Sequence, residues 1–207
     1  KKRESECYAL LGAAKKYRGE YEAAIEYHLK ALAIQEKYGD DVGISKALND
    51  IGIVYKNNSR YTEAMGYYRR SLQYAKKTNQ LKSIALVTNN IGTIYSETNQ
   101  YDSAAYYLNL ALPVAKQSGD SNALVTVLSN LGEVMAHSKK YDMALHYFYQ
   151  CLGIDKVFDD KYGIIMDYSN IAGCLMKQGR FDTAKPFLDT AYRIAEDENF
   201  VKEKMNV

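Results

Sequence analysis

Asparagine and its polar relatives recur at a constant interval in this sequence. Two neighbouring columns contain Asn49, Asn89, Ser129 and Ser169, and Asp50, Asn90, Asn130 and Asn170. A carboxamide offers both a donor and an acceptor, so a ladder of such groups can hold the backbone of an extended peptide whatever its side chains. The alternative is that these amides bond to a neighbouring helix and fix how the helices stack. The sequence leaves both interpretations open.

Residues for covalent or metal chemistry are scattered. The sequence contains no G-x-S-x-G, P-loop, H-E-x-x-H or Rossmann glycine motif, and its three cysteines show no C-x-x-C spacing. His28, His137 and His146 belong to no such motif. We therefore expect no enzyme, no cofactor and no metal site. We expect His28 and Cys151 to have packing roles.

Composition narrows the class of protein further. Of 207 residues, 47% are hydrophobic and 25% are charged, as in a chain that buries a core. A net charge of +2 provides no basic tract for nucleic acid or a membrane surface. No run approaches the ~18 apolar residues of a membrane span. We expect a soluble segment, cytoplasmic in preference to periplasmic, although the sequence leaves the compartment undetermined.

The polar columns belong to a repeat that covers the chain. Shifting the sequence by the interval that separates Asn49 from Asn89 aligns five copies without a gap. The recurring small residues are Gly12, Gly52, Gly92, Gly132 and Ala172, and Ala24, Ala64, Ala104, Ala144 and Ala184. The recurring aromatic residues are Tyr21, Tyr61, Tyr101, Tyr141 and Phe181, and Tyr27, Tyr67, Tyr107, Tyr147 and Phe187. Such a period is typical of a solenoid.

Each copy is predicted to fold as two amphipathic helices. Apolar residues in the second copy follow 3, 4 and 7 spacing on both sides of the polar turn 57–60. The predicted repeats are approximately 1–40, 41–80, 81–120, 121–160 and 161–200, in a single array over 1–207. Residues 201–207 align with the start of a first helix. We therefore expect them to begin a sixth repeat, in a segment of a longer protein.

Glycine in the middle of a helix needs a steric explanation, because it costs about 1 kcal/mol relative to alanine. Four glycines in register predict a close approach of the two helices in each repeat, such as Gly92 against Ala104. The tyrosine columns around them are predicted to pack between helices. The alternative is that they form an aromatic strip that stacks on bases or sugars.

The pattern L/I-G-x-x-Y, Y-x-x-A-x-x-Y-Y and A-L resembles the tetratricopeptide repeat, as in Ile51–Tyr55 followed by Tyr61–Tyr68. The repeat is about six residues longer than the usual ~34. In this it resembles the arrays of Rap-type peptide receptors, Pins-type adaptors and kinesin light chains. The resemblance implies an all-α fold, an α-α superhelix that forms a right-handed solenoid of five helix pairs plus the start of a sixth.

The resemblance also implies where a ligand would bind, because the first helix of each tetratricopeptide repeat lines the concave surface. Long-repeat relatives use asparagine there to hold a peptide. The predicted groove residues are Lys46, Asn49, Lys56, Asn89, Asn90, Thr93, Glu97, Ser129, Asn130, Glu133, Ser169 and Asn170. Their charges run from basic (Lys46, Lys56) to acidic (Glu97, Glu133), which would orient a ligand or favour head-to-tail contacts.

The sequence therefore predicts a non-enzymatic module that binds a protein or peptide in a preformed groove. By analogy with the long-repeat family, we expect the sensory or scaffolding segment of a bacterial signalling or transcription regulator. The alternative is a structural module that self-associates, as a homodimer for example, and so dimerises attached effector domains. The sequence does not identify the ligand.

Overall fold

A computed structural model describes residues 2–197, and all of the regular structure within that range is α-helical. The helices are α1 (Lys2–Tyr17), α2 (Tyr21–Tyr38), α3 (Asp41–Asn57), α4 (Tyr61–Lys77), α5 (Leu81–Glu97), α6 (Tyr101–Ser118), α7 (Ser121–His137), α8 (Tyr141–Phe158), α9 (Lys161–Lys177) and α10 (Phe181–Asp197). The predicted all-α fold is confirmed for these residues. The predicted start of a sixth repeat, 201–207, lies outside them.

Turns between the helices recur with the same period as the helices. The turn residue inside each repeat has a positive φ, at Gly19, Ser59, Asn99, Lys139 and Gly179. The turn residue between repeats does too, at Gly39, Asn79, Gly119 and Asp159. Left-handed backbone ends a helix and reverses the chain within a few residues. After two of these turns, Asp40 and Asp160 accept hydrogen bonds from the backbone N–H groups of Gly43 and Gly163, each at 3.0 Å.

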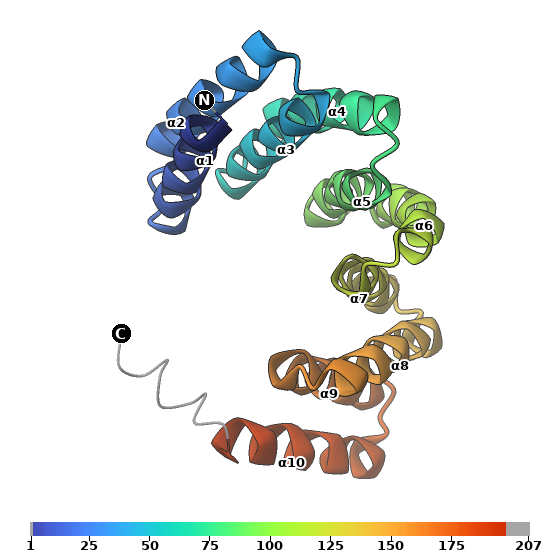
Figure 1. Ribbon diagram of the computed structural model, residues 1–207. Coiled ribbons are helices and arrows are strands. Elements are labelled where there is room, and N and C mark those ends of the chain that lie inside the picture. Colours follow the sequence, from blue (N-terminus) through green and yellow to red (C-terminus); the bar gives the residue numbers. More distant parts are fainter. Residues whose placement is uncertain (1, 198–207) are drawn as a thin grey trace. The chain divides into compact units, whose positions relative to one another are not determined.

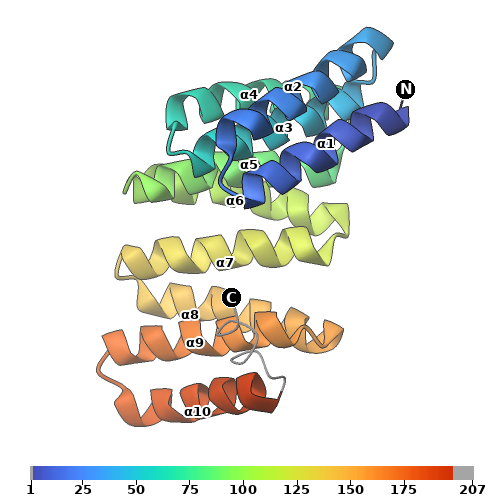
Figure 2. The ribbon, with the colours of Figure 1, turned by 90° about the vertical axis from the view of Figure 1, so that its left-hand side faces the viewer.

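The chain divides into two compact parts, Lys1–Asp120 and Ser121–Val207. In the N-terminal part, α1 to α6 pack in sequence, and α3 also contacts α5 directly. Figure 1 shows α3 and α5 on the inner side of this part and α4 and α6 on its outer side. In the C-terminal part, α7 to α10 pack in sequence with their axes side by side (Figure 2). The single array and its right-handed winding stay predictions.

The glycine column makes room for a side chain of the second helix in the same repeat. A methyl group at Gly52 would lie 2.5 Å from Cε1 of Tyr68, and one at Gly132 would lie 2.5 Å from Cε1 of Phe148. His28 and Leu108 fill the same place against Gly12 and Gly92. A methyl group at Gly92 would also lie 3.4 Å from the carbonyl oxygen of Ala104, which confirms the predicted close approach.

Tyrosines of the recurring columns pack between helices, as predicted. The rings of Tyr55 and Tyr67 stack with centroids 5.2 Å apart, and those of Tyr95 and Tyr107 do the same at 5.2 Å. All four rings are partly buried. Cys151 is fully buried and His28 is 3% exposed, so the packing roles predicted for both residues are confirmed.

Candidate functional site

Within the described chain, hollows lie at three seams between successive first helices, each with residues of the intervening second helix below it. Another hollow, of about 420 Å³, lies between α7 and α8. The seam between α1 and α3 holds about 470 Å³, with Ala31 and Gln35 of α2 below it. The seam between α3 and α5 holds about 370 Å³, with Ser71 of α4 below it. In the C-terminal part, the seam between α7 and α9 holds about 300 Å³, with Phe148 of α8 below it.

The two hollows of the N-terminal part share Lys46 and Asp50, which lie on the ridge that α3 forms between them. The walls of the first hollow come from small or apolar residues of α1, among them Ala9 and Ala13. The walls of the second include Asn49 and Leu86. This arrangement places one predicted amide and one predicted cation at the mouth of a cavity.

Asp50 carries the most perturbed charge of this ridge. Burial raises the pKa of the Asp50 carboxyl to about 6, against the opposing effect of Lys46, Lys16 and a hydrogen bond from Asn49. The carboxyl therefore changes from mostly charged at pH 7 to mostly neutral at pH 5. Asp50 occupies the position that Asn90, Asn130 and Asn170 occupy in later repeats, and its cavity position identifies it as a candidate site residue.

The asparagine ladder includes residues that line a cavity and residues that bond within the fold, and Asn49 does both. Asn49 and Asn170 line hollows. The Nδ2 of Asn90 donates to Oδ1 of Asn49 over 3.0 Å, a bond between α5 and α3. Asn89 is 2% exposed, so its side chain is buried in the fold. The Asn90–Asn49 pair therefore stabilises the stacking of two repeats, which was the alternative that the sequence left open.

Other predicted groove residues of the N-terminal part also contact one another. Lys56 and Glu97 form an ion pair of 3.1 Å between α3 and α5. The hydroxyl of Thr93 donates to the carbonyl oxygen of Asn90 at 2.8 Å. The predicted basic and acidic groups thus neutralise one another at this seam, and their role in orienting a ligand stays a prediction.

The hollow of the C-terminal part collects three predicted residues: Glu133 from α7, and Ser169 and Asn170 from α9. Burial raises the pKa of the Glu133 carboxyl, and nearby His137 opposes the rise. Ser129 and Asn130, also on α7, lie one to two turns before this hollow and are partly buried. Their role in binding a ligand stays a prediction.

One lining residue of the hollow between α7 and α9, Gly173, was not selected from the sequence. For Gly173 a signal existed, because the fifth repeat carries Ala172 in the glycine column with Gly173 beside it. Where the side chains of α7 and α9 leave a cavity depends on how the two helices pack, and the column pattern does not contain that information.

Among residues 2–197, no group of three histidine, cysteine or acidic side chains is arranged to hold a metal ion. In the same range no helix has the length and apolar character needed to span a membrane. The chemistry that the hollows offer is hydrogen bonding from amide and hydroxyl groups, charged groups, and apolar surface from part of their lining.

Comparison with known protein families shows which type of repeat the chain contains. Sequence profiles of the tetratricopeptide repeat match residues 5–77, 45–117, 83–156 and 168–198. No curated protein sequence matches the chain.

Several solved structures are similar in fold. BtubC (BKLC) from P. vanneervenii is 19% identical at a TM-score of 0.83, and the match covers 94% of this chain and 80% of that one. A Rap protein complexed with competence and sporulation factor is 18% identical at a TM-score of 0.80, and the match covers 97% of this chain and 57% of that one. Aspartyl phosphate phosphatase F from Bacillus subtilis is 17% identical at a TM-score of 0.83, and the match covers 95% of this chain and 51% of that one. The chain thus spans about half the length of the latter two.

Proposed function

Because the chain belongs to the tetratricopeptide repeat family, we propose that it is a non-enzymatic interaction module. It binds an extended peptide, or an extended segment of a partner protein, along the face formed by the first helices of its repeats. We call the surface that α1, α3 and α5 form in one part, and the surface that α7 and α9 form in the other, the first-helix face of each part.

The observation that carries this proposal is the recurrence of a hollow at the seams of the first-helix face. Each hollow combines polar groups, such as those of Lys46 in the N-terminal part and Asn170 in the C-terminal part, with apolar lining residues such as Leu86 and Phe148. Amide groups at a fixed spacing suit the repeating backbone of a peptide. Because the helices that carry these groups are packed before any ligand arrives, little ordering entropy is lost on binding.

Relatives support a peptide ligand and a regulatory setting. One neighbour in fold is a Rap protein complexed with competence and sporulation factor. Another neighbour is a phosphatase by name, but only 51% of its length aligns with this chain. We propose that this chain, by analogy, is the sensory or scaffolding segment of a bacterial signalling or transcription regulator.

The test is a selection of displayed random peptides against the chain, followed by fluorescence anisotropy with an enriched peptide. We expect Asn170→Ala to weaken binding about tenfold, since it removes a donor and an acceptor from the hollow. Asn109→Ala is the matched control, because Asn109 is an exposed asparagine of α6 that bonds within its own helix. Equal binding by both variants, or no enriched peptide at all, would refute the proposal.

Self-association is a second candidate function, and the exposed apolar side chains of α10 favour it. Phe181, Leu188 and Tyr192 are all exposed on this helix. A dimer through α10 would bring attached effector domains together. Light scattering at tens of micromolar tests this function: a monomer mass removes it, whereas a dimer mass that Tyr192→Glu converts to a monomer supports it.

A further inference from the structure

Gly173 lies at a groove position where the other repeats carry a side chain. The equivalent residues of the earlier repeats are Ala13, Ile53, Thr93 and Glu133. A methyl group added at Gly173 would meet no atom within 4 Å, whereas one added at Gly132 would clash with Phe148. The absence of a side chain at Gly173 therefore serves no packing contact between helices, and it leaves open space.

That open space is part of the hollow of about 300 Å³ between α7 and α9. The ring of Phe148 and the side chains of Ala136 and Cys174 close its bottom with apolar surface. At its rim lie polar groups, among them Asn170 and Lys177. The volume is that of one or two amino-acid side chains, and it is too small for a helix.

At the corresponding level of the seam between α3 and α5, Thr93 stands in place of Gly173, and its side chain is bonded to the backbone of α5. The 3.1 Å ion pair between Lys56 and Glu97 crosses the seam, at positions that Ala136 and Lys177 occupy in the C-terminal part. At these positions the C-terminal part therefore carries smaller residues: Ala136 where α3 has Lys56, and Gly173 where α5 has Thr93.

We propose that the hollow at Gly173 is a subsite for one apolar side chain of a bound peptide, of the size of leucine or phenylalanine. The inference rests on the proposed peptide-binding function and adds a specificity to it. Burying such a side chain against Phe148 removes apolar surface from water, which favours binding by about tenfold or more over alanine. Asn170 at the rim is placed to bond the peptide backbone beside that side chain.

Gly173→Leu fills the hollow from within and tests the proposal. Gly173 lies inside α9 without a positive φ, so leucine suits its backbone and raises the helix propensity. The variant should therefore fold at least as stably as the unmodified chain. Gly66→Leu on α4 is the matched control, since a methyl group there also meets no atom within 4 Å and Gly66 lines none of the hollows described above.

The probes are three short peptides, acetyl-Ala-X-Ala-amide with X as phenylalanine, leucine or alanine, titrated into the ¹⁵N-labelled chain. We expect the phenylalanine and leucine probes to shift amide resonances of 133–137 and 169–177, and the alanine probe to do so at least tenfold more weakly. Gly173→Leu should abolish these shifts and Gly66→Leu should preserve them. Shifts that survive Gly173→Leu, or no shifts with any probe, would overturn the proposal.

Failure of the subsite and failure of the proposed function give different results. A selected peptide that loses affinity with Asn170→Ala but not with Gly173→Leu refutes the subsite and leaves the peptide-binding function standing. Short probes that bind at Gly173, with no longer peptide enriched by selection, support the subsite and refute an extended groove.

Discussion

At the scale of single residues, the same residue type has two opposite uses in this chain. Gly12, Gly52, Gly92 and Gly132 are small because a side chain of the following helix occupies their space. Gly66, Gly153 and Gly173 lie in helices where an added methyl group would meet no atom within 4 Å. The first set stabilises the helix pairs, and the second set is free to change without loss of packing.

Substituting one glycine of each kind in neighbouring helices separates these uses. Gly52→Ala should lower the free energy of unfolding by about 1–3 kcal/mol, because its methyl group clashes with Tyr68. Gly66→Ala on α4 should raise it by up to about 1 kcal/mol through helix propensity. Urea denaturation measures both. Equal effects of the two substitutions would contradict the packing role of the glycine column.

His28 makes the N-terminal part sensitive to acid. Burial, with a smaller contribution from the charge of Lys16, lowers the pKa of its imidazole to about 4, and its Nδ1 has no hydrogen-bond partner in the part of the chain that the structure describes. Because the folded pKa lies below the ordinary 6.5, the folded state resists protonation. Stability is then lost as the pH falls from about 6.5 towards 4.

His28→Phe should remove that loss, since Phe148 fills the same position against Gly132. We expect a gain in the free energy of unfolding of about 1–3 kcal/mol at pH 4.5 and a smaller change at pH 8. Denaturation at the two pH values measures it, with His146→Phe on the exposed side of α8 as the control. A gain independent of pH would show that packing alone is responsible.

At the residue scale, sequence columns predict packing better than binding. His28, Cys151 and the glycines were placed correctly because each shares a column with residues of known size. The bond between Asn90 and Asn49, and the burial of Asn89, depend on the distance between α3 and α5. A column of asparagines is compatible with either use, so the sequence left the two open.

At the scale of elements, the contact between α8 and α9 buries two carboxyl groups, which the repeat pattern should have revealed. Asp155 and Asp167 are 6% and 3% exposed. All other repeats except the first carry alanine or valine in these columns, such as Ala115 and Val127. The two carboxyl groups share a hydrogen bond, and burial together with the charge of Asp155 raises the pKa of Asp167 to about 8. The charged groups that act on the pair, Asp160 included, are acidic.

This pair should make the C-terminal part less stable in alkaline solution. The folded pKa of Asp167 lies above its ordinary value near 4, so the folded state binds more protons than the unfolded state. Stability should therefore fall as the pH rises from about 4 to 8 and then level off. Replacing the carboxyl by a neutral amide of similar size should remove this slope.

The difference in free energy of unfolding between Asp167→Asn and the unmodified chain should be more favourable to the variant by about 1–3 kcal/mol at pH 9 than at pH 5. Asp102→Asn, an exposed position on α6, serves as the control and should leave the slope unchanged. An unaltered pH dependence in Asp167→Asn would contradict proton sharing between the two carboxyls.

Element boundaries were the most predictable feature of the fold. Turns at 57–60 and at the ends of each repeat follow from breaks in apolar periodicity, and the structure ends α3 at Asn57 and begins α4 at Tyr61. The hollows between first helices were not predictable in detail. Their positions depend on which residues meet across a seam, for example a residue with a side chain such as Thr93 or one without, such as Gly173.

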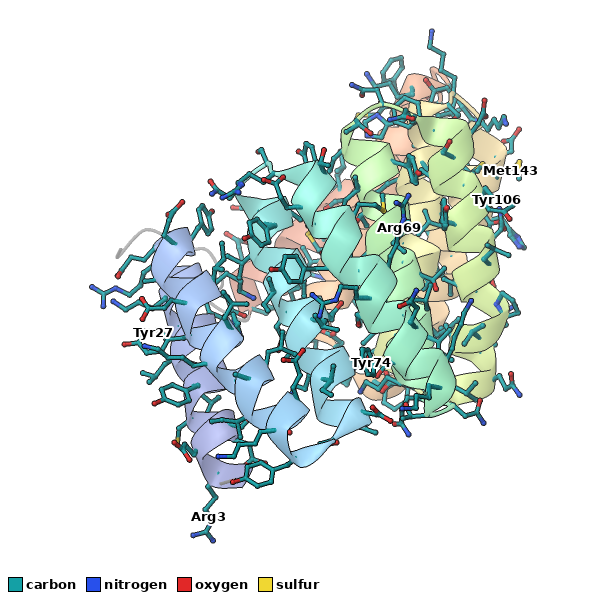
Figure 3. The ribbon with its side chains drawn as sticks, turned by 90° about the horizontal axis from the view of Figure 1, so that it is seen from above. Arg3, Tyr27, Arg69, Tyr74, Tyr106 and Met143 are labelled. Carbon is teal, nitrogen blue, oxygen red and sulfur yellow. The ribbon has the colours of Figure 1, made fainter. Side chains whose placement is uncertain are left out.

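At the scale of the whole molecule, first and second helices have different tasks. The second helices carry the packing columns and present exposed side chains such as Tyr106, 61% exposed, which points outward from α6 (Figure 3). The first helices carry variable polar residues and the hollows. A repeat of constant packing and variable lining lets one fold serve many ligands.

The most direct test of this division is to map a selected peptide on the ¹⁵N-labelled chain by amide chemical shifts. We predict that the largest shifts occur in α3, α5, α7 and α9, around Asn49 and Asn170. Shifts concentrated on α4, α6, α8 and α10, around Tyr106 for example, would contradict a peptide site on the first-helix face.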